Sequence, residues 1–468
     1  MIGAMASSFR DDAKGEARPD QAERGSQEGA RDGARERARE GVRGSAPDTA
    51  GGRAGGGARD GAGEGARRAA GDGARPGGPR PAVAALPPYV PGARPDPGQR
   101  LWKLSSNENP YPPLPSVLEA VARAAESLNR YPDMYATDVA AALAAHAGVD
   151  ASCLVVGNGS VAVLAHLLSA YVEAGRGDEV VFAWRSFEAY PIAVDIAGGR
   201  QVRVPLLPDG RHDLPAMLAA ITPRTRMVLV CSPNNPTGPT VARREFEAFL
   251  AAVPPHVLVV FDEAYLEFVA EPTAWSPAGP TPEPRAPARG EADEADCDEA
   301  VGGLPATLAR RPNLVILRTL SKAYGLAGLR VGYCVAVPEV AAAVRAVATP
   351  FGVTGVSQEA ALASLAAPAQ EELWARVSAL IAERERVTGA LREQGWSLPD
   401  TQANFVWFPL GEAAAEAAAE ARAAGILVRP FAGEGIRVSI GEPEAGDALL
   451  NLAARWRRTP PRPGTIEA

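Results

Sequence analysis

Short apolar runs alternate with helical segments through the middle of this 468-residue chain. Apolar residues recur at helical spacing in "PSVLEAVARAAESL" (115–128) and "TDVAAALAAHAG" (137–148). Seven apolar runs of strand length follow, namely "CLVVGNG", "EVVFAW", "RQVRVPL", "MVLVCSP", "HVLVVFDEAY", "NLVILRTLSK" and "RVGYCVA". Strands of this kind are typical of a sheet buried on both faces, so we predict an α/β large domain with a mostly parallel sheet covered by helices, at 130–346.

The pattern changes after this region. Long helices rich in Ala, Glu and Arg are predicted over 357–395. They precede a strand in "NFVWFPL", a helix at 412–424 and a strand in "IRVSIG". We therefore expect a smaller α+β domain at 347–457, against which an N-terminal segment at 85–129 packs.

Three further segments lack the periodic apolar residues that indicate a packed helix or strand. Residues 1–84 consist mostly of Gly, Ala, Arg, Asp and Glu, a composition that cannot repay its ordering entropy and predicts a disordered extension. A second interpretation is that translation begins later, near Val83. Residues 270–307 are rich in Pro, Ala and acidic residues and read as a disordered insertion in the large domain, and 458–468 as a loose tail.

Composition narrows the possible functions. The chain is 46% hydrophobic and 22% charged, as in ordinary globular proteins, and its net charge of −8 argues against a nucleic-acid partner. No apolar stretch reaches membrane-spanning length, and the first residues lack the apolar core of a secretory signal, so we expect the cytoplasm. The four cysteines and four histidines show no metal-ligand spacing, and no metal site is predicted.

The strand ends are the places to look for chemistry, because ligands of open α/β sheets bind at the carboxyl ends of strands. In "VVGNGSVAVLAHLL", a strand passes through Gly157-Asn158-Gly159-Ser160 into a helix. Such a turn presents free backbone N–H groups and the positive end of a helix dipole to an anion such as phosphate. Taken alone, it is more often only a tight connection between a strand and a helix.

Two other strands end in polar side chains. In "CSPNNPTGP", Asn235 follows a strand, although residues of this type also form ordinary turns. In "VVFDEAYLEF", Asp262 ends an apolar run and Tyr265 follows three residues later. A carboxylate at such a position normally needs a cationic partner, so a structural salt bridge is the alternative to a functional role.

Two basic residues complete the set. Lys322 lies in "RTLSKAYGLAGLRVGY", where apolar surroundings favour a depressed pKa and Schiff-base chemistry, or else a side chain that extends to solvent. Arg437, in "IRVSIGEP", points to the opposite face from Ile436 and Val438 if this is a strand. A guanidinium group binds carboxylates bidentately, although an exposed strand arginine is the simpler interpretation.

Taken in order, the motifs "SNENPY", "NRYP", "GNGS", "SPNNPTG", "DEAY", "TLSKAYGLAGLRVGY" and "IRVSIG" resemble the pyridoxal-phosphate aminotransferases of fold type I. Within that class they look like the branch of histidinol-phosphate and aromatic amino acid aminotransferases. The likeness covers about residues 85–457 except 270–307. It implies pyridoxal 5′-phosphate as the cofactor and a homodimer with shared active sites.

The resemblance also implies a role for each matching residue. Lys322 would hold the aldehyde carbon of the cofactor and later move a proton at the substrate Cα. Asp262 would pair with the pyridine nitrogen, so that the ring acts as an electron sink. Asn235 and Tyr265 would hydrogen-bond the 3-hydroxyl oxygen, and Phe187 would stack on the ring. Lys322, Asp262 and Tyr265 are thus the implied catalytic residues.

The remaining implied roles concern phosphate and substrate. Tyr131 would reach the phosphate in the neighbouring subunit, Arg437 would bind the substrate α-carboxylate, and Asn107 would line the substrate pocket. The implied phosphate ligands are the backbone of Gly159, Ser160 and Val161, the hydroxyls of Thr319 and Ser321, and the guanidinium of Arg330.

Two branches compete for the substrate. The chain has Val161-Ala162 where histidinol-phosphate enzymes often read Asp-Glu, and "FAGEG" (431–435) resembles the aromatic branch. We therefore expect ping-pong transamination between an aromatic amino acid (Phe, Tyr or Trp, or their keto acids) and 2-oxoglutarate or glutamate. Arg429 can help bind a substrate phosphate in the other branch, which leaves histidinol-phosphate aminotransferase of histidine biosynthesis as the alternative. A threonine-phosphate-type decarboxylase shares the lysine and the aspartate.

Overall fold

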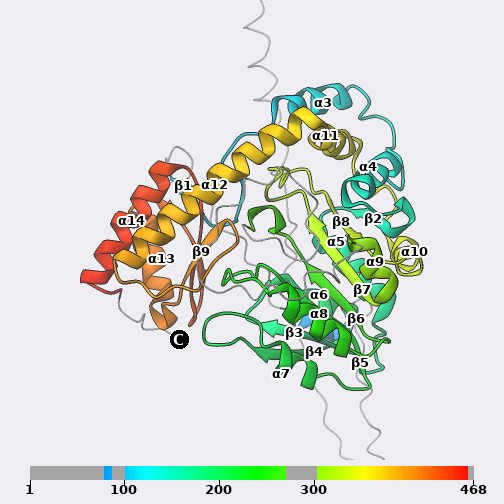
Figure 1. The fold of residues 1–468 in the computed structure, drawn as a ribbon, viewed down its shortest axis with the longest axis horizontal. Coiled ribbons are helices and arrows are strands. Elements are labelled where there is room, and N and C mark those ends of the chain that lie inside the picture. The colour runs from blue at the N-terminus through cyan, green and yellow to red at the C-terminus, as the bar shows by residue number, and fades with distance from the viewer. Residues whose placement is uncertain (1–77, 87–100, 270–302, 462–468) are drawn as a thin grey trace, which may run out of the picture. The chain divides into compact units, whose positions relative to one another are not determined.

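A computed structural model describes residues 78–86, 101–269 and 303–461. Its largest element is a seven-stranded sheet in the order β2-β8-β7-β6-β5-β3-β4 (Figure 1). The strands run parallel except β8, which is antiparallel to both β2 and β7. The seven strands are β2 (Leu154–Gly157), β3 (Glu179–Trp184), β4 (Arg200–Pro205), β5 (Thr225–Cys231), β6 (Leu258–Asp262), β7 (Leu314–Thr319) and β8 (Gly332–Val335). Each coincides with one of the predicted apolar runs, although β5 begins two residues earlier than its run, and the predicted mostly parallel sheet is confirmed.

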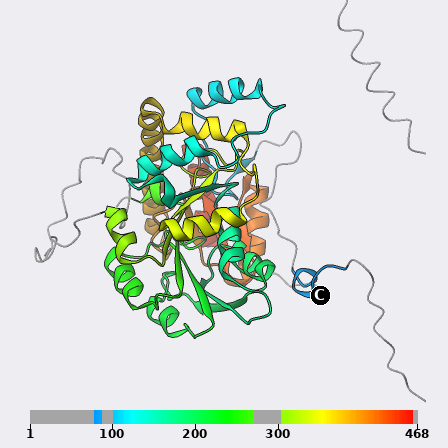
Figure 2. The same ribbon diagram turned by 90° about the vertical axis from the view of Figure 1, so that its right-hand side faces the viewer.

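Alternate side chains of these strands enter two apolar cores. In β3, Val180 and Phe182 belong to one core, whereas Val181 and Ala183 belong to the other. Figure 2 shows helices on both sides of the strands. The first core includes α5 (Ser160–Tyr171), α6 (Ala189–Ala197) and α10 (Pro338–Val347). The second includes α4 (Thr137–Ala147), α7 (Leu214–Ala219), α8 (Arg243–Ala252), the short 3₁₀ helix η2 (Leu266–Phe268) and α9 (Gly303–Arg310). Burial of both faces explains why the strands read as continuous apolar runs.

The C-terminal residues build a second, antiparallel sheet in the order β11-β12-β9. Its strands are β9 (Phe405–Phe408), β11 (Arg429–Phe431) and β12 (Gly435–Ser439). The helices of this part are α11 (Gly355–Leu365), α12 (Ala367–Glu393), α13 (Ala414–Ala423) and α14 (Pro443–Arg458). In Figure 1 the long helix α12 extends from α11 to α14, and it packs against both.

The N-terminal segment is tied to the C-terminal part. Strand β1 (Trp102–Lys103) pairs in parallel with β10 (Ile426–Leu427). Helix α3 (Pro115–Ala125) packs against α11. The backbone of Leu104 continues this attachment, because its N–H donates to Leu427 and its carbonyl accepts from Ser439. Residues 105–107 are therefore held close to β12.

Several predicted boundaries need correction. Residues 303–307, assigned to the disordered insertion, are helical because they begin α9, where Leu304 is buried in the core. Residues 81–84, assigned to the extension, form the short helix α2 (Pro81–Ala84). The helix predicted at 412–424 begins as a 3₁₀ turn, η3 (Gly411–Ala413), before α13; another such turn, η1 (Ala151–Cys153), precedes β2. The predicted disorder at 1–77, 270–302 and 462–468 lies outside the described residues.

Two general properties bear on function. Within the described ranges, no helix combines the length and apolar character that a membrane span requires. The same residues contain no group of three or more His, Cys, Asp or Glu side chains placed to hold a metal ion.

Candidate active site

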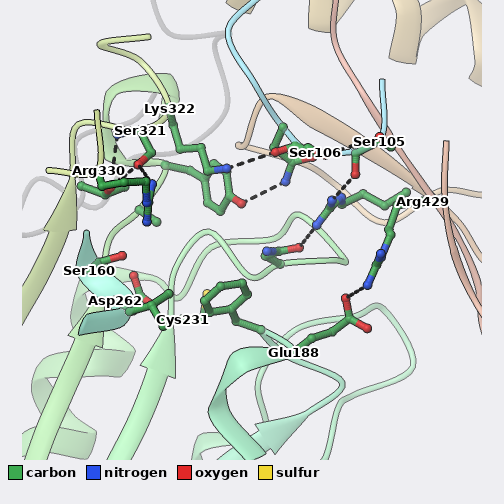
Figure 3. Close-up of a pocket in the computed structure, with 18 residues that line it drawn as sticks. Ser105, Ser106, Ser160, Glu188, Cys231, Asp262, Ser321, Lys322, Arg330 and Arg429 are labelled. Carbon is green, nitrogen blue, oxygen red and sulfur yellow. Dashed lines mark hydrogen bonds and ion pairs between the residues drawn. The ribbon is translucent and has the colours of Figure 1, made fainter. Parts of the chain in front are cut away.

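A cavity of about 250 Å³ opens at the carboxyl ends of β5, β6 and β7 and extends to β11 and β12 (Figure 3). All the residues predicted to bind cofactor or substrate line it, except Gly159 and Tyr131. The cavity is lined by Ser105, Ser106, Asn107, Ser160, Val161, Phe187, Glu188, Cys231, Asn235, Asp262, Ala264, Tyr265, Thr319, Ser321, Lys322, Arg330, Arg429 and Arg437. Below, the part around Asp262, Lys322 and Arg330 is called the cofactor end, and the part around Arg437, Arg429 and Glu188 the substrate end.

Lys322 lies in the loop after β7, with its amine turned into the cavity. Its Nζ donates to the carbonyl oxygen of Ser106 at 3.2 Å. Burial, and secondly the positive charge of Arg437, lower the pKa of Lys322 to about 7. A large fraction of this amine is therefore neutral and nucleophilic near pH 7, which the predicted covalent role requires.

Asp262 is the last residue of β6 and is buried. Its Oδ2 accepts a hydrogen bond from the Tyr190 hydroxyl at 2.8 Å, whereas Oδ1 is buried with no hydrogen-bond partner among the described residues. Burial raises the pKa of Asp262 to about 6, although the Tyr190 hydrogen bond opposes the rise. The unpaired oxygen suits a cationic N–H donor of a bound ligand.

The salt bridge considered as an alternative for Asp262 belongs to its neighbour. Glu263 points to the other side of the strand, where its Oε2 lies 2.8 Å from the guanidinium of Arg318. Both side chains are almost completely buried. One acidic residue of the pair 262–263 is thus neutralised by the fold, and the other is left facing the cavity.

An anion site lies beside Lys322. Helix α5 begins at Ser160, directly after the turn of Gly157–Gly159. Arg330 donates to Ser321 Oγ at 2.9 Å, and Thr319 donates to the same oxygen at 3.0 Å. Gly159 has φ +82°, and a Cβ there would overlap the Arg330 guanidinium, so only glycine leaves this space. Hydroxyls, a guanidinium and a helix N-terminus converge as phosphate binding requires.

The substrate end is assembled from separate segments. Arg437 donates to Asn235 Oδ1 at 2.5 Å and to the carbonyl of Ser105 at 2.8 Å. Asn107 Nδ2 donates to the Tyr265 hydroxyl at 2.9 Å. These contacts join residues 105–107 to the loops after β5 and β6 and to β12.

Tyr131 lies away from this cavity. Its side chain is 84% exposed, and its ring centroid is 4.8 Å from that of Phe351, which is 40% exposed. Tyr131 therefore contributes nothing to the cavity of its own chain, and its predicted role in a neighbouring subunit stays a prediction.

Sequence reasoning missed several groups that shape the cavity. Glu188 and the Ser105–Ser106 backbone line it, and Tyr190 donates to Asp262. Glu188 and Tyr190 both lie in "WRSFEAYP", where only Phe187 was assigned. An acidic residue next to the stacking aromatic was the available signal. The main-chain role of Ser106 left no signal in the sequence.

The residues present fit pyridoxal phosphate. The unpaired Asp262 oxygen matches a protonated pyridine nitrogen, and the Lys322 amine matches the aldehyde. The space at Gly159 beside Arg330 and Ser321 matches the phosphate. Phe187 supplies an aromatic ring to the same cavity. These groups would hold the cofactor.

Comparison with known proteins agrees with this assignment. Residues 99–451 match the model of the family described as aminotransferase class I and II. An aromatic amino acid aminotransferase of Streptomyces avermitilis is 50% identical over 380 residues, covering 81% of this chain and 97% of that protein. A protein of the same name from Thermobifida fusca is 49% identical over 379 residues, covering 81% and 96%.

Solved structures are similar as well. The histidinol-phosphate aminotransferase of Sinorhizobium meliloti, in complex with pyridoxal-5′-phosphate, has a TM-score of 0.67 at 27% identity and covers 81% of this chain and 97% of that one. A mutant aspartate aminotransferase of Thermus thermophilus has a TM-score of 0.64 at 24% identity, covering 81% and 99%, and supports the fold alone. On its sequence, its fold and its cavity, this chain belongs to the class I and II aminotransferases and is a pyridoxal-phosphate-dependent transaminase.

Proposed function

We propose that this transaminase acts on aromatic amino acids or their keto acids, with glutamate or 2-oxoglutarate as the second substrate pair. The observation that carries the proposal is the 45–50% identity, over about four fifths of the chain, to proteins named aromatic amino acid aminotransferase. The amino group moves in two half-reactions, as in ping-pong transamination.

Lys322 has two tasks in this proposal. Bound pyridoxal phosphate supplies an electron sink for the charge that develops when the substrate Cα loses its proton. The Lys322 amine, with a pKa lowered to about 7, would accept that proton from Cα and later donate it to complete the half-reaction. Its hydrogen bond to the Ser106 carbonyl holds the amine on the substrate side of the cavity.

Asp262 and its neighbours orient the cofactor. The Asp262 carboxylate, held by Tyr190, pairs with the pyridine nitrogen and keeps it protonated. The Tyr265 hydroxyl and the Asn235 amide line the cavity and would hydrogen-bond the ring oxygen. Ser160, Ser321 and Arg330 would bind the phosphate and so anchor the cofactor in the cavity.

Arg437 binds the α-carboxylate of the substrate. Its guanidinium group is buried and is already positioned by Asn235 and Ser105, so little ordering remains to be done when substrate arrives. Asn107, hydrogen-bonded to Tyr265, would line the space beside it.

The proposal includes a homodimer in which Tyr131 reaches the phosphate site of the second subunit. Its support is the exposed aromatic pair of Tyr131 and Phe351, which a second copy would cover. A cytoplasmic location also belongs to the proposal, and the free thiols of the described cysteines suit a reducing compartment.

One experiment tests the substrate class. Purified protein loaded with cofactor is incubated with glutamate and, separately, phenylpyruvate, prephenate and imidazole acetol phosphate. We expect the highest specificity constant with phenylpyruvate. A higher value with imidazole acetol phosphate would replace this proposal with histidinol-phosphate aminotransferase, the second candidate, which is kept because Arg429 lines the cavity. Release of carbon dioxide without keto-acid formation would instead identify a decarboxylase.

A further inference from the structure

Two arginines stand side by side at the substrate end. Arg429 of β11 is paired in register with Arg437 of β12, and in an antiparallel sheet directly opposite residues project from the same face. Both line the cavity. Neighbouring guanidinium groups repel each other unless an anion lies close.

The protein itself supplies such an anion to Arg429. The Oε2 atom of Glu188 lies 2.7 Å from the Arg429 guanidinium, and the two side chains are 29% and 9% exposed. A pair so little exposed is screened less than one on the surface. By contrast, the hydrogen bonds described for Arg437 go to uncharged oxygens of Asn235 and Ser105.

Glu188 is held in place by its own backbone. It follows Phe187 directly and is the residue before α6, so its position is set by the same turn that presents the aromatic ring to the cavity. Figure 3 shows Glu188 and Arg429 joined on the side of the cavity away from Lys322 and Arg330. A substrate held at Arg437 would extend its side chain beside this ion pair.

We propose that Glu188 is a specificity-determining residue that neutralises Arg429 and so gives substrates with an uncharged aromatic side chain a higher specificity constant than those with a phosphate or a second carboxylate, with glutamate and 2-oxoglutarate kept as the less favoured second pair. This inference rests on the proposed function and names the group that sets its substrate class. A side-chain carboxylate, or a phosphate in place of the α-carboxylate, that reaches Arg429 must either displace Glu188 from it or lie beside two carboxylate oxygens. An aromatic ring meets neither cost, and it stacks favourably on guanidinium groups.

The test compares two carboxylate-to-amide variants. Glu188→Gln removes the charge paired with Arg429. Glu247→Gln is the matched control, because Glu247 forms an ion pair with Arg243 on α8 and does not line the cavity. Specificity constants are measured for phenylalanine, glutamate and histidinol phosphate with wild type and both variants.

We expect Glu188→Gln to raise the ratio of the glutamate or histidinol-phosphate constant to that of phenylalanine by about ten-fold, a change of about 1.4 kcal/mol. The Glu247→Gln ratio should stay near that of wild type. Equal losses for all three substrates, or the same ratio in both variants, would overturn the proposal.

A binding measurement separates charge selection from a structural role. Glutarate, a dicarboxylate, and 3-phenylpropionate, a monocarboxylate with an aromatic ring, are titrated as unreactive inhibitors. Glu188→Gln should tighten glutarate several-fold relative to 3-phenylpropionate, and an unchanged ratio counts against Glu188. If wild type fails to prefer aromatic substrates, the proposed function fails, whereas the shift between wild type and variant still decides the role of Glu188.

Discussion

The two ends of the cavity are built in different ways. At the cofactor end, Asp262 and Thr319 end the adjacent strands β6 and β7, and Ser160 begins the helix that follows β2 of the same sheet. At the substrate end, Arg429 and Glu188 are brought together from segments 241 residues apart, and Arg437 donates to Ser105 of a third segment. The cofactor end is therefore a property of one sheet, and the substrate end a property of several tertiary contacts.

This difference indicates which substitutions should abolish the reaction and which should change only the substrate preference. The residues of the cofactor end are all positioned by the same sheet and would all hold the same ligand. A substitution of one of them should therefore abolish most of the transaminase activity. The substrate end has charged groups paired across chain segments, as in Arg429 with Glu188 and Arg185 with Glu434. A single charge change there should alter selectivity while the chemistry survives.

The largest expected effect comes from Lys322→Ala at the cofactor end. Loss of the amine should lower transamination by at least about 10⁴-fold, since both proton transfer and covalent attachment are lost. The visible absorption band that borohydride abolishes should disappear as well. The chain has three lysines, Lys14, Lys103 and Lys322, so peptide mapping after reduction identifies the labelled one. Lys103→Ala is the control, and label on any lysine other than Lys322 would contradict the assignment.

A smaller loss is expected from Asp262→Asn. The amide keeps the size of the side chain but cannot carry the charge that holds a pyridine N–H, and we expect a loss of about 10²- to 10³-fold in kcat.

Tyr190→Phe should lower kcat less than Asp262→Asn does. It removes the hydrogen bond that lowers the pKa of Asp262, so in cofactor-free protein that pKa should rise above about 6. Cofactor affinity, followed by absorbance from pH 5 to 8, should then increase at higher pH than in wild type. An unshifted profile would argue against this link.

At the substrate end, Arg437→Gln should lower the specificity constant for all amino acids by about 30- to 100-fold, mainly through KM.

The Arg437→Gln change should also affect Lys322 at the cofactor end, because the positive charge of Arg437 helps to lower the pKa of Lys322 to about 7. Covalent capture needs the neutral amine, which prevails above this pKa. The capture rate should therefore rise with pH through about 7 in wild type and at higher pH in the variant. Arg392→Gln, an exposed arginine paired with Asp400, serves as the control. If the capture rate has the same midpoint pH in wild type, Arg437→Gln and Arg392→Gln, the charge of Arg437 does not influence Lys322 and this prediction is wrong.

The smallest effect on activity is expected from Glu263→Gln, one residue from Asp262. Removing this carboxylate leaves the buried Arg318 guanidinium without its ion-pair partner, and we expect a loss of about 3 kcal/mol in the free energy of unfolding. Activity per folded molecule should be largely retained. Thermal or denaturant unfolding measures the first quantity, and replacing both partners with apolar residues should restore part of it. A chemical defect as large as that of Asp262→Asn would contradict the division between these neighbours.

Much of this molecule could be predicted from local patterns. All seven strands of the large sheet coincide with apolar runs, and the strand-end positions of Asp262 and Lys322 made them candidates, whereas a role for Thr319 came from the family resemblance. The end of the insertion was misplaced because "GLPATLAR" begins α9 directly after a polar stretch, and a short helix carries little periodic signal. Glu188 escaped prediction because its importance depends on Arg429, which lies 241 residues later.

By itself, the sequence determined which segments become strands and which polar residues stand at their ends, since periodicity and turn chemistry are local properties. Only the tertiary structure decided that Asp262 faces the cavity while Glu263 meets Arg318, and that Glu188 neutralises Arg429. Those outcomes depend on distances of about 3 Å between distant segments, because the interaction of two charges depends on how close they lie and how far they are buried. Candidate residues for the chemistry could be identified from the sequence, whereas the ion-pair partner of each charged residue could not.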